Sequence, residues 1–194
     1  MTRKRIAVLA LQGAFIEHEK MLTDIGIDSC EVRQLADWNQ PKDGLIIPGG
    51  ESTTQLKLLK DLGLLEPIRT AIEKGLPVFG TCAGLILLAK KVEGEDFDRI
   101  STMDIDVRRN AYGRQLGSFH TYASCGTLGE IPMTFIRAPY IEAVGEGVQV
   151  LAKVDDKIVA AQYGKQLVLA FHPELDAAES TAVHENFLRM YENK

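Results

Sequence analysis

The chain has 194 residues, of which 45% are hydrophobic and 25% charged, so it is long enough for one domain with its own core. Its formal net charge of −5 argues against a surface built to bind nucleic acid or an anionic membrane. No apolar stretch approaches the roughly 20 residues of a membrane helix, and the first apolar run, residues 6–11, is too short for a signal peptide. We expect a single domain over residues 1–194, with small molecules and other proteins as its partners.

The three cysteines of the chain are Cys30, Cys82 and Cys125. An odd and sparse set of this kind does not resemble a disulfide framework, and the spacings match no zinc-binding pattern. The cysteine content therefore predicts a reducing, cytoplasmic setting without a metal site.

Short apolar runs alternate with segments of helical periodicity in the first half of the chain. Apolar composition and flanking turn residues predict strands over residues 6–11, 44–47 and 77–80. The spacing of apolar residues predicts helices over residues 15–25, 52–62, 65–74 and 83–91. Strands that alternate with helices favour parallel pairing, with helices on both faces of the sheet.

The second half of the chain has a different pattern. Short strands joined by turns that contain glycine or aspartate are predicted over residues 134–137, 149–154, 158–162 and 167–171. Asp155 and Asp156 form a plausible hairpin corner, and a closing helix is predicted over residues 180–191. The expected fold is α/β: a doubly wound, flavodoxin-like, mostly parallel sheet in three layers, with a small antiparallel extension in the second half.

The segment Gly80-Thr81-Cys82-Ala83-Gly84 follows a predicted strand and opens a predicted helix. This spacing is typical of a nucleophile elbow, because a tight strand-to-helix turn needs small residues on both sides of the strained nucleophile. The helix N-terminus favours the thiolate of Cys82, and the backbone N–H of Ala83 is a candidate oxyanion donor. A buried structural cysteine in a strand–turn is the alternative interpretation of this pentapeptide.

A thiolate nucleophile needs a general base, and that base needs a group that orients it. Phe171-His172-Pro173-Glu174 supplies both at the end of the last predicted strand, where catalytic groups of doubly wound sheets gather. Residues two apart on an extended segment face the same side, so Glu174 could reach the imidazole of His172. The alternative is a histidine that ends a strand beside a solvated glutamate.

Three further histidines are weaker candidates for the base. His18 and His184 lie within predicted helices and are expected at the surface or at an interface. His120, in Ser118-Phe119-His120, is harder to dismiss, and the sequence leaves its role open.

A second glycine turn, Pro48-Gly49-Gly50-Glu51-Ser52-Thr53-Thr54, also joins a predicted strand to a predicted helix. Its paired glycines let a ligand approach the backbone closely, and the N–H groups of such a turn can bind an oxyanion or a carboxylate. The segment matches neither glycine-rich pattern of nucleotide phosphate binding. Without context, a helix N-cap at Ser52 or Thr53 explains it equally well.

Together these segments resemble the class I, triad-type glutamine amidotransferases, and more narrowly the glutaminase subunits of pyridoxal 5′-phosphate synthases. The matching motifs lie in family order and cover nearly the whole chain: Leu9-Ala10-Leu11-Gln12-Gly13-Ala14 and the segments 48–54, 79–85, 109–115, 135–139 and 171–175. The elbow and His-Pro-Glu specify only the amidotransferase class. Leu-Gln-Gly-Ala, Gly-Gly-Glu-Ser-Thr-Thr and Phe-Ile-Arg-Ala-Pro narrow the resemblance to the glutaminase subunit.

The resemblance implies a catalytic triad of Cys82, His172 and Glu174. Cys82 attacks the side-chain amide of glutamine, His172 transfers the proton, ammonia leaves, and water hydrolyses the resulting γ-glutamyl thioester. The implied contacts to the substrate glutamine are Gly50, Glu51, Ser52, Arg109, Ile136 and Arg137. An arginine suits a carboxylate, although a surface ion pair is the alternative for either one. The residues implied near the oxyanion site and the partner interface are Gln12, Gly49 and Ala83.

The chain departs from the family pattern at two positions. Family members usually carry acidic residues before Ser118 and after Phe119, where this chain has Gly117 and His120. The triad is untouched, but contacts near residues 109–115 are expected to differ.

The resemblance also implies a partner, because ammonia is mostly protonated at neutral pH and must travel along a protected path. The implied partner is a (β/α)₈ synthase subunit, in a multi-subunit complex, that condenses ammonia with a pentose phosphate and a triose phosphate. The glutaminase half requires no flavin, metal or nucleotide, so no cofactor is expected. Docking to the synthase is expected to increase its activity.

Three alternative functions are open: a glutaminase that serves another pathway, a non-catalytic module that uses Cys82 for redox sensing or binding, and a cysteine peptidase or other amidase. The Leu-Gln-Gly-Ala and Phe-Ile-Arg-Ala-Pro motifs argue against the first, and His-Pro-Glu argues against the second. A panel of substrates would separate the third.

Overall fold

The structure, a computed structural model, describes residues 4–109 and 117–190 of the chain. Its first half contains β1 (Arg5–Leu9), α1 (Phe15–Asp24), β2 (Asp28–Val32), α2 (Leu35–Trp38), β3 (Gly44–Ile47), α3 (Ser52–Asp61), α4 (Leu65–Glu73), β4 (Val78–Thr81), α5 (Ala83–Leu88) and β5 (Ala89–Val92). The second half contains β6 (Met103–Arg108), β7 (Ser118–Ser124), the 3₁₀ helix η1 (Gly126–Leu128), β8 (Glu130–Ile136), β9 (Tyr140–Val144), β10 (Gln149–Val154), β11 (Lys157–Tyr163), β12 (Gln166–Leu169), the 3₁₀ helix η2 (Pro173–Leu175) and α6 (Ala182–Arg189).

The central sheet combines a parallel half with an antiparallel extension. Within the described residues its strand order is β2-β1-β3-β4-β12-β11-β9-β6-β5, with β10 paired to β11. The strands from β2 to β12 are parallel, whereas β12, β11, β9 and β6 pair antiparallel in turn. β7 and β8 form a separate antiparallel pair. The predicted fold, with its antiparallel extension in the second half, is confirmed.

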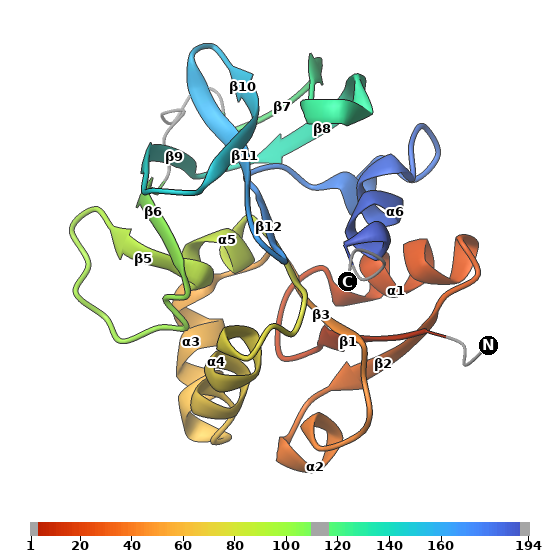
Figure 1. Ribbon diagram of the computed structural model, residues 1–194, viewed down its shortest axis with the longest axis vertical. Helices are drawn as coiled ribbons and strands as arrows, with labels where there is room; N and C mark the ends of the chain where they lie inside the picture. The colour runs from red at the N-terminus through yellow and green to blue at the C-terminus, as the bar shows by residue number, and fades with distance from the viewer. Residues whose placement is uncertain (1–3, 110–116, 191–194) are drawn as a thin grey trace.

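Helices cover both faces of the parallel strands: α1 and α6 lie on one face, and α3, α4 and α5 lie on the other (Figure 1). The direction of winding reverses between β1 and β3, which are neighbours in the sheet. In sheets of this type the loops after the two strands at the reversal frame the ligand site. Here these loops are in contact, because the N–H of Ala14 donates to the carbonyl of Gly49 at 3.0 Å.

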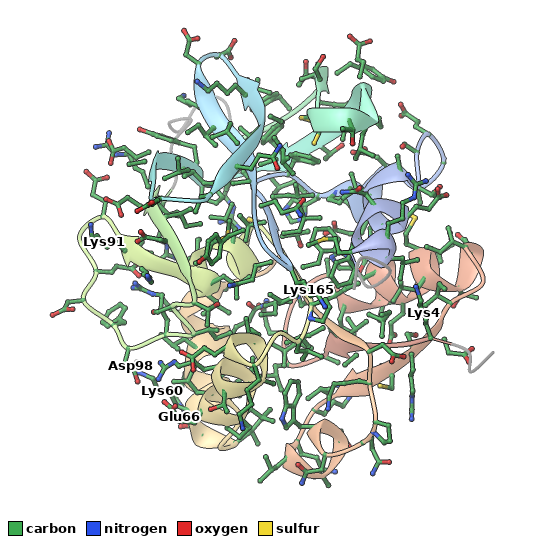
Figure 2. All side chains as sticks on the ribbon, in the orientation of Figure 1. Lys4, Lys60, Glu66, Lys91, Asp98 and Lys165 are labelled. Atoms are coloured by element: carbon green, nitrogen blue, oxygen red, sulfur yellow. The ribbon has the colours of Figure 1, made fainter. Side chains whose placement is uncertain are left out.

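The core follows the parallel strands because these carry consecutive apolar residues. Every residue of β3 and of β4 is buried. Phe79 of β4 packs against Phe187 of α6, with 5.4 Å between the ring centroids. Charged side chains lie at the surface instead, as Figure 2 shows for the exposed Lys60, Glu66, Lys91, Asp98 and Lys165. In the part of the chain that the structure describes, no helix is both long and apolar enough to cross a membrane.

Some predicted boundaries are wrong for physical reasons. The helix predicted over residues 83–91 ends at Leu88, because residues 89–92 pair with β6 as an edge strand. The first strand ends at Leu9 rather than at residue 11. The hairpin corner is confirmed: Asp155 and Asp156 have φ values of 48° and 62° between the antiparallel β10 and β11. Residue 191 of the predicted last helix and residues 110–115 of the family motif lie outside the described residues.

Candidate active site

Cys82 lies in the tight turn between β4 and α5, with φ 47° and ψ −95°. A positive φ is costly for a residue with a side chain and persists only where the surroundings impose it. Here the close approach of α5 to β3 imposes it, because a Cβ on Gly84 would lie 2.2 Å from the carbonyl oxygen of Ile47. The N–H of Cys82 donates to the carbonyl of Leu169 at 2.8 Å, which fixes the turn to β12. The predicted elbow is therefore present.

His172 and Glu174 follow β12 and are both buried. His172 Nδ1 lies 2.7 Å from Glu174 Oε1, and the N–H of His172 donates to the carbonyl of Thr134 at 2.8 Å. The expected contact is present, but the segment is not extended as predicted. Residues 173–175 form the 3₁₀ helix η2, which turns the carboxylate back toward the imidazole.

The imidazole of His172 has a raised pKa. Burial alone lowers the pKa of a histidine, because it disfavours the charged form. Interactions with Cys82 and Glu174 outweigh burial and raise the pKa of His172 to about 10. His172 is therefore an imidazolium at neutral pH, placed between a sulfur and a carboxylate.

The glycine turn after β3 crosses directly over this pair. A Cβ on Gly49 would lie 2.3 Å from His172 Cε1 and 3.4 Å from Cys82 Cβ. Any larger residue would therefore displace the imidazole. The side chains of His172 and Cys82 therefore both lie close to Gly49.

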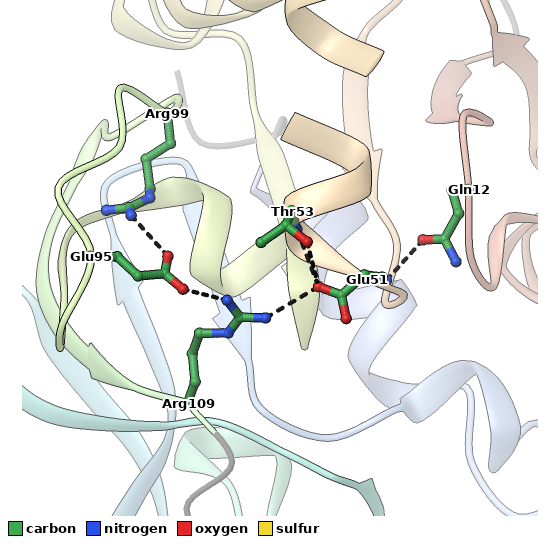
Figure 3. Close-up of polar contacts among 6 residues, drawn as sticks. All are labelled: Gln12, Glu51, Thr53, Glu95, Arg99 and Arg109. Carbon is green, nitrogen blue, oxygen red and sulfur yellow. Dashed lines mark hydrogen bonds and ion pairs between the residues drawn. The ribbon is translucent and has the colours of Figure 1, made fainter. Parts of the chain in front are cut away.

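Gln12, in the loop after β1, holds the glycine turn in place. Its side-chain Oε1 accepts a hydrogen bond from the N–H of Glu51 at 2.8 Å, as Figure 3 shows. Its backbone carbonyl accepts one from the side chain of Gln55 at 2.8 Å, and Gln55 also donates to the carbonyl of Pro48 at 3.1 Å. The loops after β1 and β3 therefore act as one hydrogen-bonded unit.

Arg109 follows β6 and lies between two carboxylates (Figure 3). Its Nη2 is 3.1 Å from Glu51 Oε1, and its Nη1 pairs with Glu95. Glu95 in turn pairs with the buried Arg99 at 3.1 Å. Burial raises the pKa of Glu51, but hydrogen bonds from Thr53 and the contact with Arg109 outweigh burial and lower it. Glu51 is thus a carboxylate that competes for one edge of the Arg109 guanidinium.

The predicted N-cap of α3 at Ser52 or Thr53 is wrong. Glu51 is the N-cap residue, and its carboxylate accepts from the N–H of Thr53 at 3.2 Å. The longer glutamate side chain folds back over the first turn, which leaves Ser52 buried as the first helical residue.

These segments enclose a cavity of about 420 Å³, a volume typical of small-molecule sites. The predicted residues that line it are Gln12, Gly49, Gly50, Glu51, Ser52, Cys82, Arg109, Ile136, Arg137 and His172. The predicted Ala83 and Glu174 are not in its lining. Ala83 is buried as the first residue of α5, and Glu174 is buried against His172.

The lining also contains residues that were not predicted as site residues: Gly13, Ala14, Ile86, Pro139 and Leu175. All but Ile86 belong to the motifs that carry the family resemblance. Ile86 lies one helical turn beyond Cys82, so its spacing in the sequence was the available signal.

The prediction that His18 and His184 lie at a surface or an interface is wrong. Both are 0% exposed, because α1 and α6 face the sheet at these positions. His18 precedes Met21 and Leu22 by three and four residues, which places it on the apolar face of its helix. That spacing was the signal that could have found it.

His120 lies on β7, with its Nε2 3.8 Å from Asp176 Oδ1. Asp176 is buried and accepts hydrogen bonds from the hydroxyl of Thr134 at 2.6 Å and from its N–H at 3.1 Å. His120 therefore borders the end of the η2 segment and is not in the cavity lining.

Comparison with known proteins agrees with this geometry. The model of the SNO glutamine amidotransferase family matches residues 8–193. A pyridoxal 5′-phosphate synthase subunit PdxT from Streptococcus pneumoniae is 55% identical over 193 residues, which are 98% of this chain and 99% of that protein. A crystal structure of a glutamine amidotransferase has a TM-score of 0.91 at 42% identity and covers 96% of this chain and 98% of its own. The chain therefore belongs to the SNO glutamine amidotransferase family.

Proposed function

We propose that this protein is the glutaminase subunit of a pyridoxal 5′-phosphate synthase. It hydrolyses L-glutamine to L-glutamate and ammonia and delivers the ammonia to a (β/α)₈ synthase subunit. The observation that carries the proposal is Cys82 at a nucleophile elbow, in one cavity with a His172–Glu174 pair that is 2.7 Å apart. The 55% identity to PdxT supports the assignment of this ammonia to pyridoxal 5′-phosphate synthesis.

In the proposed mechanism the Cys82 thiolate attacks the side-chain amide carbon of glutamine. The His172 imidazolium donates its proton to the amide nitrogen, the C–N bond breaks, ammonia leaves, and a γ-glutamyl thioester forms. His172 then accepts a proton from water as the water attacks the thioester, which releases glutamate and restores the thiolate. Glu174 orients the imidazole and stabilises its charged form through the contact at Nδ1.

The remaining lining residues bind the substrate. Arg109 and Glu51 offer opposite charges that match the α-carboxylate and the α-ammonium group of glutamine. Ser52, Gly50, Ile136 and Arg137 complete the substrate contacts. The developing oxyanion is bound at the turn at Gly49, which Gln12 holds, and the N–H of Ala83, which follows Cys82 but does not line the cavity, is the second donor that the sequence implies.

Exposed apolar side chains beside the cavity support docking of a partner protein. Ile136 is 38% exposed and Leu175 is 45% exposed, and both line the cavity. Apolar side chains that lie in water around a polar site are typical of protein–protein contacts. A synthase subunit that covers them would shield the ammonia from water.

The proposal includes a cytoplasmic setting and one functional domain over residues 1–194. The match to the family model over residues 8–193 supports a single domain. The free thiols of Cys30, Cys82 and Cys125 fit a reducing compartment.

The pKa of His172 predicts the alkaline limit of activity. The reaction needs the protonated imidazole, so kcat/KM, corrected for deprotonation of the α-ammonium group of glutamine, is expected to fall only near pH 10, where His172 loses its proton. Replacing Glu174 with glutamine removes an anionic partner that raises this pKa, so the descending limb moves to lower pH. Profiles of kcat/KM between about pH 6 and 11 for both proteins measure the shift. A wild-type limb close to the ordinary histidine pKa of 6.5 would contradict the assignment.

The Glu95→Gln variant tests the role of Arg109. Glu95 is not in the cavity lining but pairs with Arg109, so its neutralisation frees the guanidinium to move away from the substrate. We expect KM for glutamine to rise roughly fivefold, about 1 kcal/mol, with kcat little changed. Glu93→Gln is the matched control, because Glu93 pairs with the neighbouring Arg108 and does not line the cavity. Equal KM values in the two variants would contradict the role given to Glu95.

The proposed function is tested by glutamate release from glutamine, measured with and without a pyridoxal 5′-phosphate synthase subunit. We expect release that increases when the synthase is added. No glutamate under either condition would contradict the glutaminase assignment. Stimulation only by the synthase of a different pathway would replace the proposed partner.

A further inference from the structure

Two buried histidines continue the polar contacts of Glu174 away from the cavity. His18 of α1 and His184 of α6 are both 0% exposed. His18 Nε2 lies 3.5 Å from Glu174 Oε2 and 3.3 Å from Thr81 Oγ1. His18 Nδ1 lies 2.9 Å from His184 Nε2. The chain of contacts therefore runs from the carboxylate through α1 to α6.

The geometry is consistent with one arrangement of protons. Glu174 Oε1 accepts from His172, whereas the buried Oε2 has no hydrogen-bond partner among the described residues and lies 3.5 Å from His18 Nε2. A proton on His18 Nε2 places the positive end of an N–H dipole beside that oxygen and leaves His18 Nδ1 as an acceptor. His184 must then donate from Nε2, which leaves its Nδ1 without a proton. This Nδ1 is the nitrogen of His184 for which the described residues offer no partner.

Both histidines are neutral in this arrangement. Burial, followed by the repulsion that a protonated His18 would meet from the cationic forms of His184 and His172, lowers the pKa of His18 well below its ordinary value. Burial lowers the pKa of His184 to about 3. A neutral donor can hold the Glu174 carboxylate without neutralising it, so the full negative charge is available to the imidazolium of His172.

We propose that His18 is a positioning residue that holds the Glu174 carboxylate toward His172, and that His184 fixes the tautomer of His18. The inference rests on the proposed glutaminase function. Because His18 also contacts Thr81, the residue before Cys82, one side chain links the nucleophile elbow to the carboxylate.

Two substitutions of His18 separate this role from a purely structural one. The amide nitrogen of glutamine reaches about as far as Nε2, so His18→Gln retains a donor to Glu174. Asparagine reaches only as far as Nδ1, so His18→Asn retains a partner for His184 and loses the donor. We expect His18→Asn to lower kcat roughly 10–100-fold at unchanged KM, and His18→Gln to recover most of that loss. In a Glu174→Gln background, His18→Asn should have little further effect.

A proton NMR signature tests the inference without activity. The hydrogen-bonded Nδ1 proton of His172, assigned by its absence in His172→Gln, should shift in His18→Asn and stay in place in His18→Gln. Equal effects of the two substitutions, or full additivity with Glu174→Gln, would overturn the proposal. If the two His18 variants show the predicted NMR behaviour but the wild type releases no glutamate with its synthase, the glutaminase function fails and the positioning contact stands. If His18→Asn does not fold, His184→Leu takes its place in the kinetic and NMR experiments, because it removes the donor that fixes the tautomer of His18.

Discussion

Replacement of Cys82 by alanine is expected to lower the kcat of glutamate release by at least about 10⁴-fold. The substitution removes the sulfur that forms the thioester, so only direct attack by water remains. Alanine keeps the Cβ and the backbone of the elbow, and the helix that follows is held by the contact between Gly84 and β3. The loss should therefore occur without a loss of folding, which thermal unfolding of both proteins would measure.

Cys30→Ala is the matched control for this prediction. Cys30 lies on β2 at the edge of the sheet and is half-buried. Its removal should leave kcat unchanged. A Cys82→Ala protein that keeps more than about a tenth of wild-type activity would contradict nucleophilic catalysis by Cys82.

The second large effect is expected for His172→Gln, in which kcat falls by about 10³–10⁴-fold. Glutamine can occupy the space under Gly49 but can neither hold a positive charge beside Cys82 nor transfer a proton. Loss of the imidazolium also destabilises the thiolate. The rate at which iodoacetamide alkylates Cys82 near neutral pH should therefore fall together with kcat.

Mass spectrometry of the labelled peptide separates Cys82 from the half-buried Cys30. The control for His172→Gln is His120→Gln, because His120 borders Asp176 and does not line the cavity. That variant should keep both its activity and its alkylation rate. An unchanged alkylation rate in His172→Gln would show that His172 does not stabilise the thiolate.

The sequence predicts the buried β3 and β4 and also the half-exposed β10, but it misses strands that no apolar run marks. The bounds of β3 are predicted correctly because all four of its residues are apolar and buried. In β2 only Val32 is fully buried, so no apolar run marks this strand. β5 continues an apolar helix into an edge strand, and pairing with β6, which is distant in the sequence, decides its conformation.

The same distinction applies to the site. Cys82 and the His172–Glu174 pair are predictable because turn geometry confines each motif to a few adjacent residues. The contact between His18 and His184 joins side chains 166 residues apart. Arg109 is likewise paired with Glu95 and Glu51 by packing of separate segments. No local pattern encodes such pairs, so they become visible only in the folded chain.

The most direct test of the account uses glutamine that carries heavy nitrogen in its side-chain amide. The protein and a pyridoxal 5′-phosphate synthase subunit are supplied with both sugar phosphates and with excess unlabelled ammonium in the buffer. We expect pyridoxal 5′-phosphate to acquire the heavy nitrogen in spite of this ammonium, and Cys82→Ala to abolish the transfer. Glutamate formation with the heavy nitrogen released entirely into the buffer would contradict delivery of ammonia to the synthase.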